Sequence, residues 1–271
     1  MKVNVIGGGL AGCECAYQLL RRGFEVDMYE MRGVKNTPCH STERLAELVC
    51  SNSLKAQSLD NASGLLKYEL ARLDSLILKC AYMSDVPAGG ALAVDRVKLS
   101  ESVEKILNCF DGFELIRKEI DTVELNIPTV IATGPLTSDK MAKWFKDFLG
   151  GEYLNFYDAV APIVDGDSID YSKAFFASRY GKGGDDYLNC AMNKEQYLTF
   201  YDALIHAERA KLKDFELEVF ERCMPIEVMA SRGVDTMRYG PLRPIGIRNP
   251  HSDERPYAVI QLRKEDGEGS A

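Results

Sequence analysis

The chain has 271 residues, of which 46% are hydrophobic, so it is long enough to bury one large core or two modest ones. Its 33 basic and 41 acidic residues give a formal net charge of −8, which opposes non-specific binding to a polyanion and confines any RNA contact to a local basic patch. Eight scattered cysteines and three histidines predict neither a disulfide framework nor a metal site.

The first thirty residues predict a strand, a helix and a second strand. Residues 2–6 form a short apolar run, and three glycines follow it. Leu10–Arg22 carries apolar residues at helical spacing, Gly23 ends that helix, and Glu25–Glu30 alternates as a strand does. A helix between two strands places the strands side by side and parallel, so we expect the start of a Rossmann-like sheet.

The middle of the chain is less regular. Helical spacing predicts helices over three segments, and short apolar runs predict strands over three more. The last of these strands ends at Gly134, and we expect it to return to the first sheet. The predicted helices are Glu43–Val49, Ala62–Ile77 and Val97–Asn108, and the predicted strands are Phe113–Ile116, Thr122–Leu125 and Thr129–Thr133.

The last 130 or so residues predict a second, smaller α/β domain. Ser138–Leu149 and Glu195–Ala210 have amphipathic helical spacing, and Tyr257–Leu262 is an apolar strand. The fold class is therefore α/β, with a Rossmann-like domain and a smaller α/β insertion domain. We expect the first domain at 1–140, the insertion or substrate domain at 141–247, and the start of a return to the first domain at 248–271. No run of about 18 apolar residues occurs, so we expect no membrane span and a cytoplasmic protein.

The glycine pattern Gly7-x-Gly9-x-x-Gly12 is typical of dinucleotide-binding proteins. It lets the backbone turn tightly between strand and helix and lets a pyrophosphate approach the helix amino terminus. Glu30 falls 18 residues after Gly12, at the end of the second strand, where a carboxylate can accept hydrogen bonds from ribose hydroxyls. These residues do not distinguish FAD from NAD, and a glycine turn in an unrelated α/β protein is the alternative.

Two cysteines have sequence surroundings that suit a reactive thiol. Cys50 lies between a predicted helix and a polar loop, and Cys223 follows Arg222 and precedes a proline by two residues. A thiol beside a cation in a loop can ionise readily and act as a nucleophile or base, although a buried apolar role is the alternative for each. Residues 222–248 also hold five arginines against two acids, which is either a phosphate-binding strip or a solvated face.

Six sequence blocks resemble the folate- and FAD-dependent tRNA uracil-C5 methyltransferases of bacteria, and they span nearly the whole chain. The blocks are Val5–Gly12, Glu47–Leu54, Val86–Arg96, Ala132–Thr137, Asp186–Cys190 and Cys223–Glu227.

The resemblance implies methylation of C5 of a T-loop uridine in tRNA, with FAD as the cofactor and NAD(P)H and methylenetetrahydrofolate as co-substrates. It implies that Cys50 and Cys223 share attack on C6 of the base and removal of the C5 proton. It implies no membrane and no partner protein. Asn189 and Arg96 are further candidates for the pocket. The implied cofactor contacts are Gly7, Gly8, Gly9, Gly12, Glu30, Met31, Arg32, Ala132, Thr133 and Gly134.

Members of that family continue past the equivalent of Gln261–Arg263, so we expect this chain to be an N-terminal part that lacks the segment completing the FAD site. Two rival hypotheses follow. The glycine pattern alone fits another FAD-dependent oxidoreductase, acting on a small molecule. The early end of the chain fits an inactive remnant of the methyltransferase.

Overall fold

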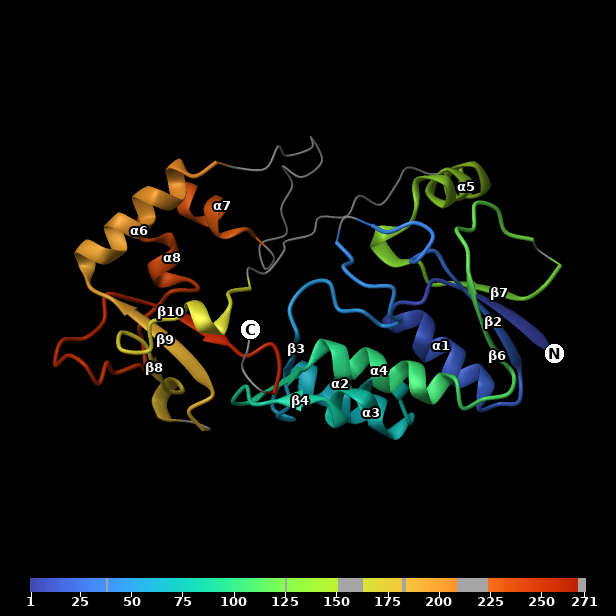
Figure 1. Ribbon diagram of the computed structural model, residues 1–271, viewed down its shortest axis with the longest axis horizontal. Helices are drawn as coiled ribbons and strands as arrows, with labels where there is room; N and C mark the ends of the chain where they lie inside the picture. Colours follow the sequence, from blue (N-terminus) through green and yellow to red (C-terminus); the bar gives the residue numbers. More distant parts are fainter. Residues whose placement is uncertain (38, 125, 151–162, 182–183, 209–223, 268–271) are drawn as a thin grey trace. The chain divides into compact units, whose positions relative to one another are not determined.

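The chain divides into two compact units, whose helices and strands are drawn in Figure 1. Each unit has a sheet and a hydrophobic core of its own. The computed structural model describes residues 1–37, 39–124, 126–150, 163–181, 184–208 and 224–267. The first unit comprises residues 1–85 and 92–156, and the second comprises residues 86–91 and 157–271.

The first unit is built on a parallel sheet with the strand order β6-β2-β1-β7. The strands are β1 (Lys2–Ile6), β2 (Glu25–Glu30), β6 (Phe113–Arg117) and β7 (Thr129–Ile131). β1 pairs with β2 on one side and with β7 on the other, and β2 pairs with β6. Because every pair is parallel, the carboxyl ends of β1, β2 and β7 meet at one edge of the sheet, as in a Rossmann-like fold.

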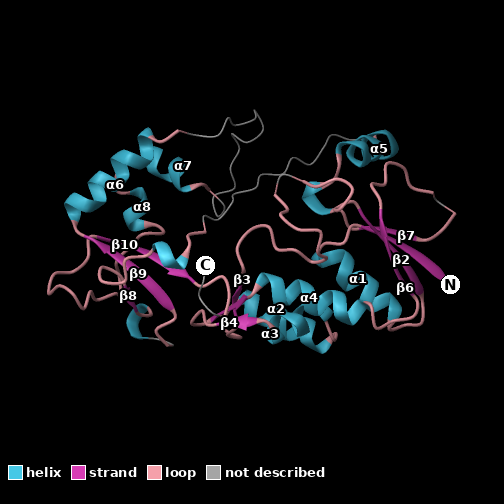
Figure 2. Cartoon of the chain, in the orientation of Figure 1, coloured by secondary structure: helices cyan, strands magenta, loops and turns pink. Residues whose placement is uncertain are grey.

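Helices cover this sheet and bury its apolar residues. α1 (Leu10–Leu20) packs on β1 and β2, and α3 (Leu76–Met83) and α4 (Arg96–Leu107) pack on α1. The core includes Val5 and Met28, both fully buried. Figure 2 shows α1, α3 and α4 together with α2 (Ala62–Arg72), while α5 (Asp139–Leu149) lies apart from them.

A second small sheet has the strand order β3-β5-β4. It contains β3 (Ser53–Ala56), β4 (Asp85–Val86) and β5 (Ala91–Val94). A 3-10 turn, η1 (Gly134–Leu136), follows β7 and is not part of this sheet.

The second unit is an antiparallel sheet packed against short helices. β9 (Tyr187–Met192) lies between β8 (Phe175–Phe176) and β10 (Ala258–Arg263). The core forms around Tyr197 of α6 (Lys194–His206) and Met237 of α8 (Thr236–Tyr239), both fully buried. The remaining elements are α7 (Ile226–Ser231), η2 (Gly166–Ser168) and η3 (Arg179–Gly181).

Three predicted elements differ in the structure. Residues 43–49 form no helix, because Ala46 has a φ of +53° and its amide donates to the carbonyl oxygen of Gly8. The helix predicted over 62–77 is divided into α2 and α3 at Asp74, where φ is +58°. Residues 122–124 carry no strand, and Leu125 lies outside the described residues.

The two units do not follow the predicted domain ranges. α5, expected in the insertion domain, belongs to the first unit. β10, expected to lead back to the first domain, pairs with β9 in the second unit, from Ala258 opposite Met192 to Arg263 opposite Tyr187. The apolar residues Ala258 and Val259 are fully buried there, so the strand completes the core of the second unit.

Candidate functional site

The turn between β1 and α1 requires glycine at two of its positions. Gly7 has a φ of +104°, and a Cβ there would lie 2.6 Å from the carbonyl oxygen of Ala132. A Cβ on Gly12 would lie 1.8 Å from the carbonyl oxygen of Gly7. The first turn of α1 therefore touches the backbone of the strand that precedes it, which no larger residue permits.

The other two glycines of the turn have different surroundings. A Cβ on Gly8 would lie 2.5 Å from Cδ2 of Leu45 and 2.8 Å from Oε2 of Glu30. Gly9, the N-cap of α1, has no atom within 4 Å of such a Cβ. One side of the turn is thus packed against the protein, and the other leaves the amino-terminal end of α1 open to an anionic group.

Glu30 ends β2 beside this turn and is only 5% exposed. Its Oε2 accepts a hydrogen bond from the Gly8 amide at 2.7 Å, and its Oε1 accepts one from the Arg32 amide at 2.9 Å. Burial raises the pKa of the Glu30 carboxyl, but the hydrogen bonds and positive charge of Arg32 and the amide of Gly8 outweigh it, so the pKa lies below its ordinary value. The carboxylate is ionised near neutral pH and fixed against the turn.

Arg32 is a buried cation between two carboxylates, a role that its sequence position did not reveal. Its side chain is 2% exposed, with Nη2 at 3.0 Å from Oε2 of Glu30 and Nη1 at 3.3 Å from Oε2 of Glu47. Nη2 also donates to the carbonyl oxygen of Gly8 at 3.2 Å. The preceding residue, Met31, is half-buried and begins a turn whose amides at Val34 and Lys35 bond to its carbonyl oxygen.

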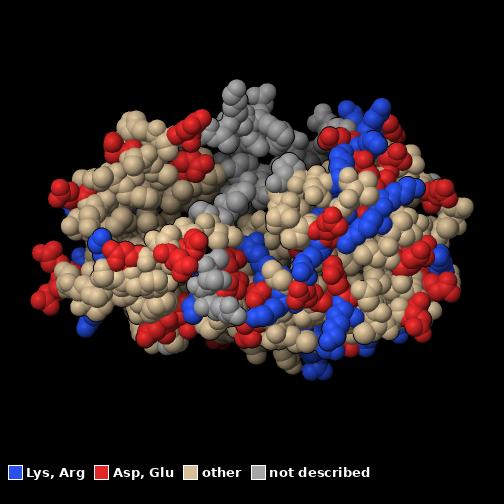
Figure 3. Space-filling model, viewed as in Figure 1, with Lys and Arg blue, Asp and Glu red and all other residues tan. Residues whose placement is uncertain are grey.

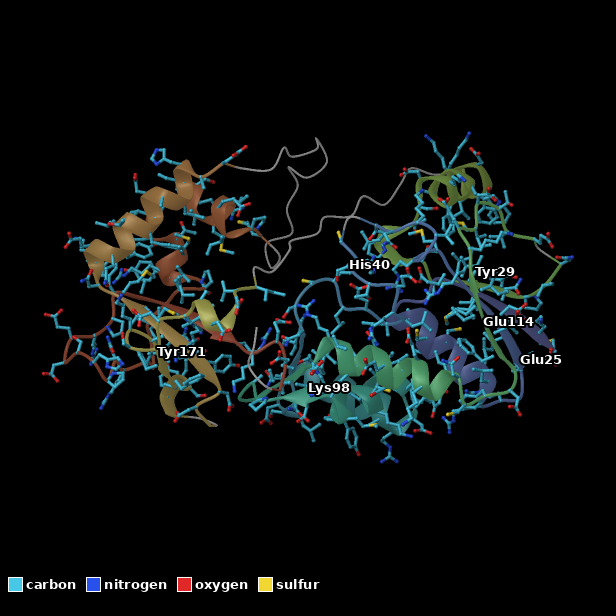
Figure 4. The ribbon with its side chains drawn as sticks, in the orientation of Figure 1. Glu25, Tyr29, His40, Lys98, Glu114 and Tyr171 are labelled. Carbon is cyan, nitrogen blue, oxygen red and sulfur yellow. The ribbon has the colours of Figure 1, made fainter. Side chains whose placement is uncertain are left out.

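Glu47 is a second residue whose role the sequence did not reveal. Its carboxylate accepts hydrogen bonds from the amide and hydroxyl groups of both Ser41 and Thr42. Burial raises its pKa, whereas these bonds and the charge of His40, labelled in Figure 4, lower it, and the net shift is downward. Glu47 therefore folds residues 41–47 into a compact loop whose Leu45 and Ala46 pack, fully buried, against the glycine turn.

The segment after β7 completes the strand-end edge. The Ala132 amide donates to the carbonyl oxygen of Ile6 at 2.7 Å, which holds Ala132 and Thr133 beside Gly7. Gly134 has a φ of +61°, and a Cβ there would meet no atom within 4 Å. The predicted cofactor residues of β1, β2 and β7 are thus brought to one edge of the sheet, with open space over Gly9 and over Gly134.

Cys50 lies on the surface of a segment that is held on both sides. Arg96, at the start of α4, donates from Nη1 to the carbonyl oxygen of Leu48 at 2.6 Å and from Nη2 to that of Cys50 at 2.5 Å. Asn52 is fully buried and accepts from the Val94 amide at 3.0 Å. Asp95 caps α4, and its carboxylate lies 3.2 Å from the ammonium group of Lys98 (Figure 4), so the helix start that carries Arg96 is itself fixed.

Two buried thiols of the first unit, Cys13 and Cys80, are less suited to chemistry. Burial raises the pKa of Cys13 to about 12 and that of Cys80 to about 11, so both remain protonated near neutral pH. Both are fully buried in the core of the first unit. Cys223 lies outside the described residues, as does Arg222.

The basic strip of residues 222–248 is not a uniform set of surface charges. Arg238 stacks over Tyr257 at 4.0 Å and donates to its carbonyl oxygen at 3.2 Å, so it is a packing residue. Arg243 and Arg248 are exposed. Figure 3 shows positive and negative side chains intermingled over the visible face. Asn189, a candidate for the pocket, is fully buried, and its amide donates to the carbonyl oxygens of Phe175, Ala177 and Tyr187 in the second unit.

The second unit has a cavity of about 260 Å³ beside β9 and β10. Tyr171, labelled in Figure 4, and Phe176 line it and stack with ring centroids 6.4 Å apart, and Gln261 lies at its wall. In the described parts of the chain, no helix is long and apolar enough to cross a membrane. Over the same residues, no group of three or more His, Cys, Asp or Glu side chains could hold a metal ion.

The family described as "Glucose inhibited division protein A" matches residues 2–271. The chain is 54% identical to the "Methylenetetrahydrofolate--tRNA-(uracil-5-)-methyltransferase TrmFO" of Thermosipho africanus, over 100% of the chain and 63% of that protein. It is 56% identical to the protein of the same name from Moorella thermoacetica, over 99% of the chain and 62% of the relative. These matches confirm the resemblance carried by the six sequence blocks.

A solved structure of Aquifex aeolicus GidA aligns with a TM-score of 0.37 and 17% identity, over 46% of this chain and 21% of that one. The chain spans about 63% of the length of the curated relatives it matches. Because the family match extends over residues 2–271, the chain belongs to the glucose inhibited division protein A family.

Proposed function

We propose that this chain forms the cofactor-binding and uridine-facing part of a methylenetetrahydrofolate-dependent tRNA uracil-C5 methyltransferase that uses FAD. The observation that carries the proposal is the edge where β1, β2 and β7 end, with the glycine turn packed on one side and open over Gly9. The relatives named as such methyltransferases share 54% and 56% of its residues in the matched region.

The residues at this edge fit FAD. A pyrophosphate would lie over Gly9 and the open amino-terminal end of α1, where backbone amides and the helix dipole favour negative charge. Glu30 lies one hydrogen bond from Gly8 and would accept a ribose hydroxyl through the remaining lone pairs of its oxygens. Arg32 contributes by holding that carboxylate, and Met31, Ala132, Thr133 and Gly134 form the neighbouring walls.

When bound, FAD supplies the redox chemistry that converts the one-carbon unit of methylenetetrahydrofolate into a methyl group, with NAD(P)H as the reductant. The protein's own part is to activate the uracil. A thiolate bonds to C6, and the C5–C6 π pair moves to C5, which becomes the nucleophile. After methyl transfer a base removes the C5 proton, the electron pair re-forms the C5–C6 bond, and the sulfur leaves C6. Cys50 and Cys223 share these two duties.

The exposure of Cys50 and the anchoring of its backbone by Arg96 support this role. A thiol that attacks a base must be reachable, and its position must be fixed within a few tenths of an ångström. The uridine must also leave its stacked position in the T-loop to reach the thiol. Because tRNA is found in the cytoplasm, the proposal includes a cytoplasmic location and needs neither a membrane nor a protein partner.

The test uses the whole-length protein that contains this chain. We expect Cys50→Ala and Cys223→Ala each to abolish 5-methyluridine formation in tRNA, measured by mass spectrometry of its nucleosides, while the visible absorbance of bound flavin is kept. Cys109→Ala, which removes another exposed thiol, is the matched control and should retain activity.

Three results would count against the proposal. Full activity in either thiol variant refutes that thiol's role. Turnover of NAD(P)H on a small substrate without folate or RNA favours another flavin oxidoreductase. A colourless protein that does not take up added FAD refutes the cofactor assignment and supports an inactive remnant.

A further inference from the structure

In the second unit, η3 is fixed against the loop formed by residues 243–248. Arg179 donates from Nη1 to the carbonyl oxygens of Arg243 at 2.8 Å and Ile245 at 2.7 Å. The Tyr180 amide donates to the carbonyl oxygen of Gly246 at 2.8 Å. Nε of Arg179 donates to Oε1 of Gln261 at 2.8 Å, which ties the same side chain to β10. Four hydrogen bonds thus hold two consecutive residues in place.

Tyr180 is held in an unfavourable conformation with its ring on the surface. Its φ is +60° and its ψ is 16°, a left-handed conformation that is rare for a bulky residue. The ring lies over Gly246, where a Cβ would be 3.1 Å from each of three ring atoms. The side chain is nevertheless 67% exposed. One face of the ring therefore rests on a glycine, and much of the remaining ring surface is available for stacking.

Two cations, Arg179 and Arg243, lie near this ring. Burial and the charge of the exposed Arg243 both lower the pKa of Arg179, as expected for neighbouring cations. Within the described residues of the second unit, the ion pairs involve neither of these two arginines. Among the residues that the structure describes, the hydrogen bonds of Arg179 use Nε and Nη1, and the two N–H groups of Nη2 remain for a further acceptor.

We propose that Tyr180, Arg179 and Arg243 form a binding site for one nucleotide of RNA, with a base stacked on the Tyr180 ring and a phosphate bound by the two guanidinium groups. Stacking on an aromatic ring beside arginines is how single-stranded nucleic acid is commonly held. The site rests on the proposed function, because it takes the RNA as its ligand. It adds a contact in the second unit that tolerates any base.

The test measures binding of a fluorescein-labelled T-arm stem-loop RNA to the 271-residue chain by fluorescence anisotropy at low salt. We expect Tyr180→Asn to weaken binding about tenfold, because asparagine keeps the left-handed backbone but removes the ring. Tyr180→Phe should bind like the parent chain. Arg243→Gln should weaken binding and reduce the slope of log affinity against log salt by about one.

Matched controls come from a second exposed arginine and tyrosine. Arg72 lies 5.9 Å from the ring of Tyr68 on α2, so Arg72→Gln and Tyr68→Asn remove the same groups from another surface. Neither should change RNA binding.

A further variant tests the position of the ring. Gly246→Ala keeps both cations and the ring but displaces the ring, and it should weaken RNA binding as Tyr180→Asn does.

A measurement on the unaltered chain guards against misfolded variants. RNA carrying 4-thiouridine is cross-linked by light and the adduct is located by mass spectrometry; an adduct on the peptide of Tyr180 supports the site, and adducts only elsewhere overturn it. Unchanged affinity in Tyr180→Asn, an equal loss in the controls, or no RNA binding at all also overturns it. None of these readouts uses flavin or methyl transfer, so failure of the proposed function is seen separately, as missing 5-methyluridine in the whole-length protein.

Discussion

At the level of single residues, two glycines of the β1–α1 turn have different roles. Gly12 is required for packing, whereas Gly9 leaves space for the cofactor. Gly12→Ala places a methyl group 1.8 Å from the Gly7 carbonyl oxygen, so the helix must move, and we expect the free energy of unfolding to fall by about 3 kcal/mol. Gly9→Ala meets no atom within 4 Å and keeps an ordinary φ of −75°, so it should cost less than about 1 kcal/mol. Its methyl group nevertheless enters the open side of the turn. Gly9→Ala should therefore weaken binding in an FAD titration while leaving the stability in urea almost unchanged, and equal stability of the two variants would contradict the packing argument.

Glu30 gives the first unit a stability that depends on pH. Because its pKa is lower in the folded protein than its ordinary value of 4.5, the ionised carboxylate stabilises the fold above that value, and this contribution is lost as the pH falls through the folded pKa. Glu30→Gln should lower the free energy of unfolding at pH 7 by about 1–3 kcal/mol and flatten its decline in acid. The measurement is urea denaturation across the acid range. Glu114→Gln, on the exposed face of the neighbouring strand β6, is the control, and an equally flattened profile there would contradict the assignment.

Sequence patterns identified the residues that local geometry constrains, but not those that act through distant partners. Gly7, Gly12 and Glu30 could be predicted because their spacing reflects one turn and the end of the next strand. The ion pair of Arg32 with Glu47 could not be predicted, because this contact at 3.3 Å joins residues 15 positions apart across a loop with no regular period. The role of Arg96 was likewise hidden, since its acceptors are carbonyl oxygens, which every residue possesses.

At the level of elements, a carboxylate of α1 caps the amino-terminal end of α3. Glu14 accepts hydrogen bonds from the Leu76 amide at 3.1 Å, the Ile77 amide at 3.0 Å and the Ser75 hydroxyl at 2.7 Å. Glu14→Ala leaves these amides without their acceptor at the positive end of a helix, so we expect a loss of about 2 kcal/mol. Glu69→Ala, on the exposed side of α2, is the matched control. Hydrogen exchange of the α3 amides should quicken only in the first variant, and an unchanged rate there would argue against the clamp.

The elements that sequence periodicity predicted well are those that bury one face. β1, α1, β2, α4 and α6 lie within a few residues of their predicted bounds, because their apolar positions recur at the period of the element that forms. Periodicity failed at residues 43–49 for a tertiary reason: the Leu45 amide bonds to Oε1 of Glu104 at 2.7 Å, and the Ala46 amide bonds to Gly8. These bonds to other parts of the chain replace the bonds of a local helix.

The two units of the molecule have separate hydrophobic cores, so each unit should unfold cooperatively and independently of the other. Leu99 belongs to the core of the first unit and Met237 to that of the second, and both are fully buried. Leu99→Ala and Met237→Ala should each lower the free energy of unfolding by about 2–5 kcal/mol, but only for the unit whose core loses the side chain. Hydrogen exchange under mild denaturant, followed peptide by peptide, should therefore quicken in one unit and stay unchanged in the other. Leu73→Ala, which removes a side chain that is 70% exposed, should leave both units as they were. Equal quickening of both units by either core variant would mean that they unfold together, and would refute the separation of the cores.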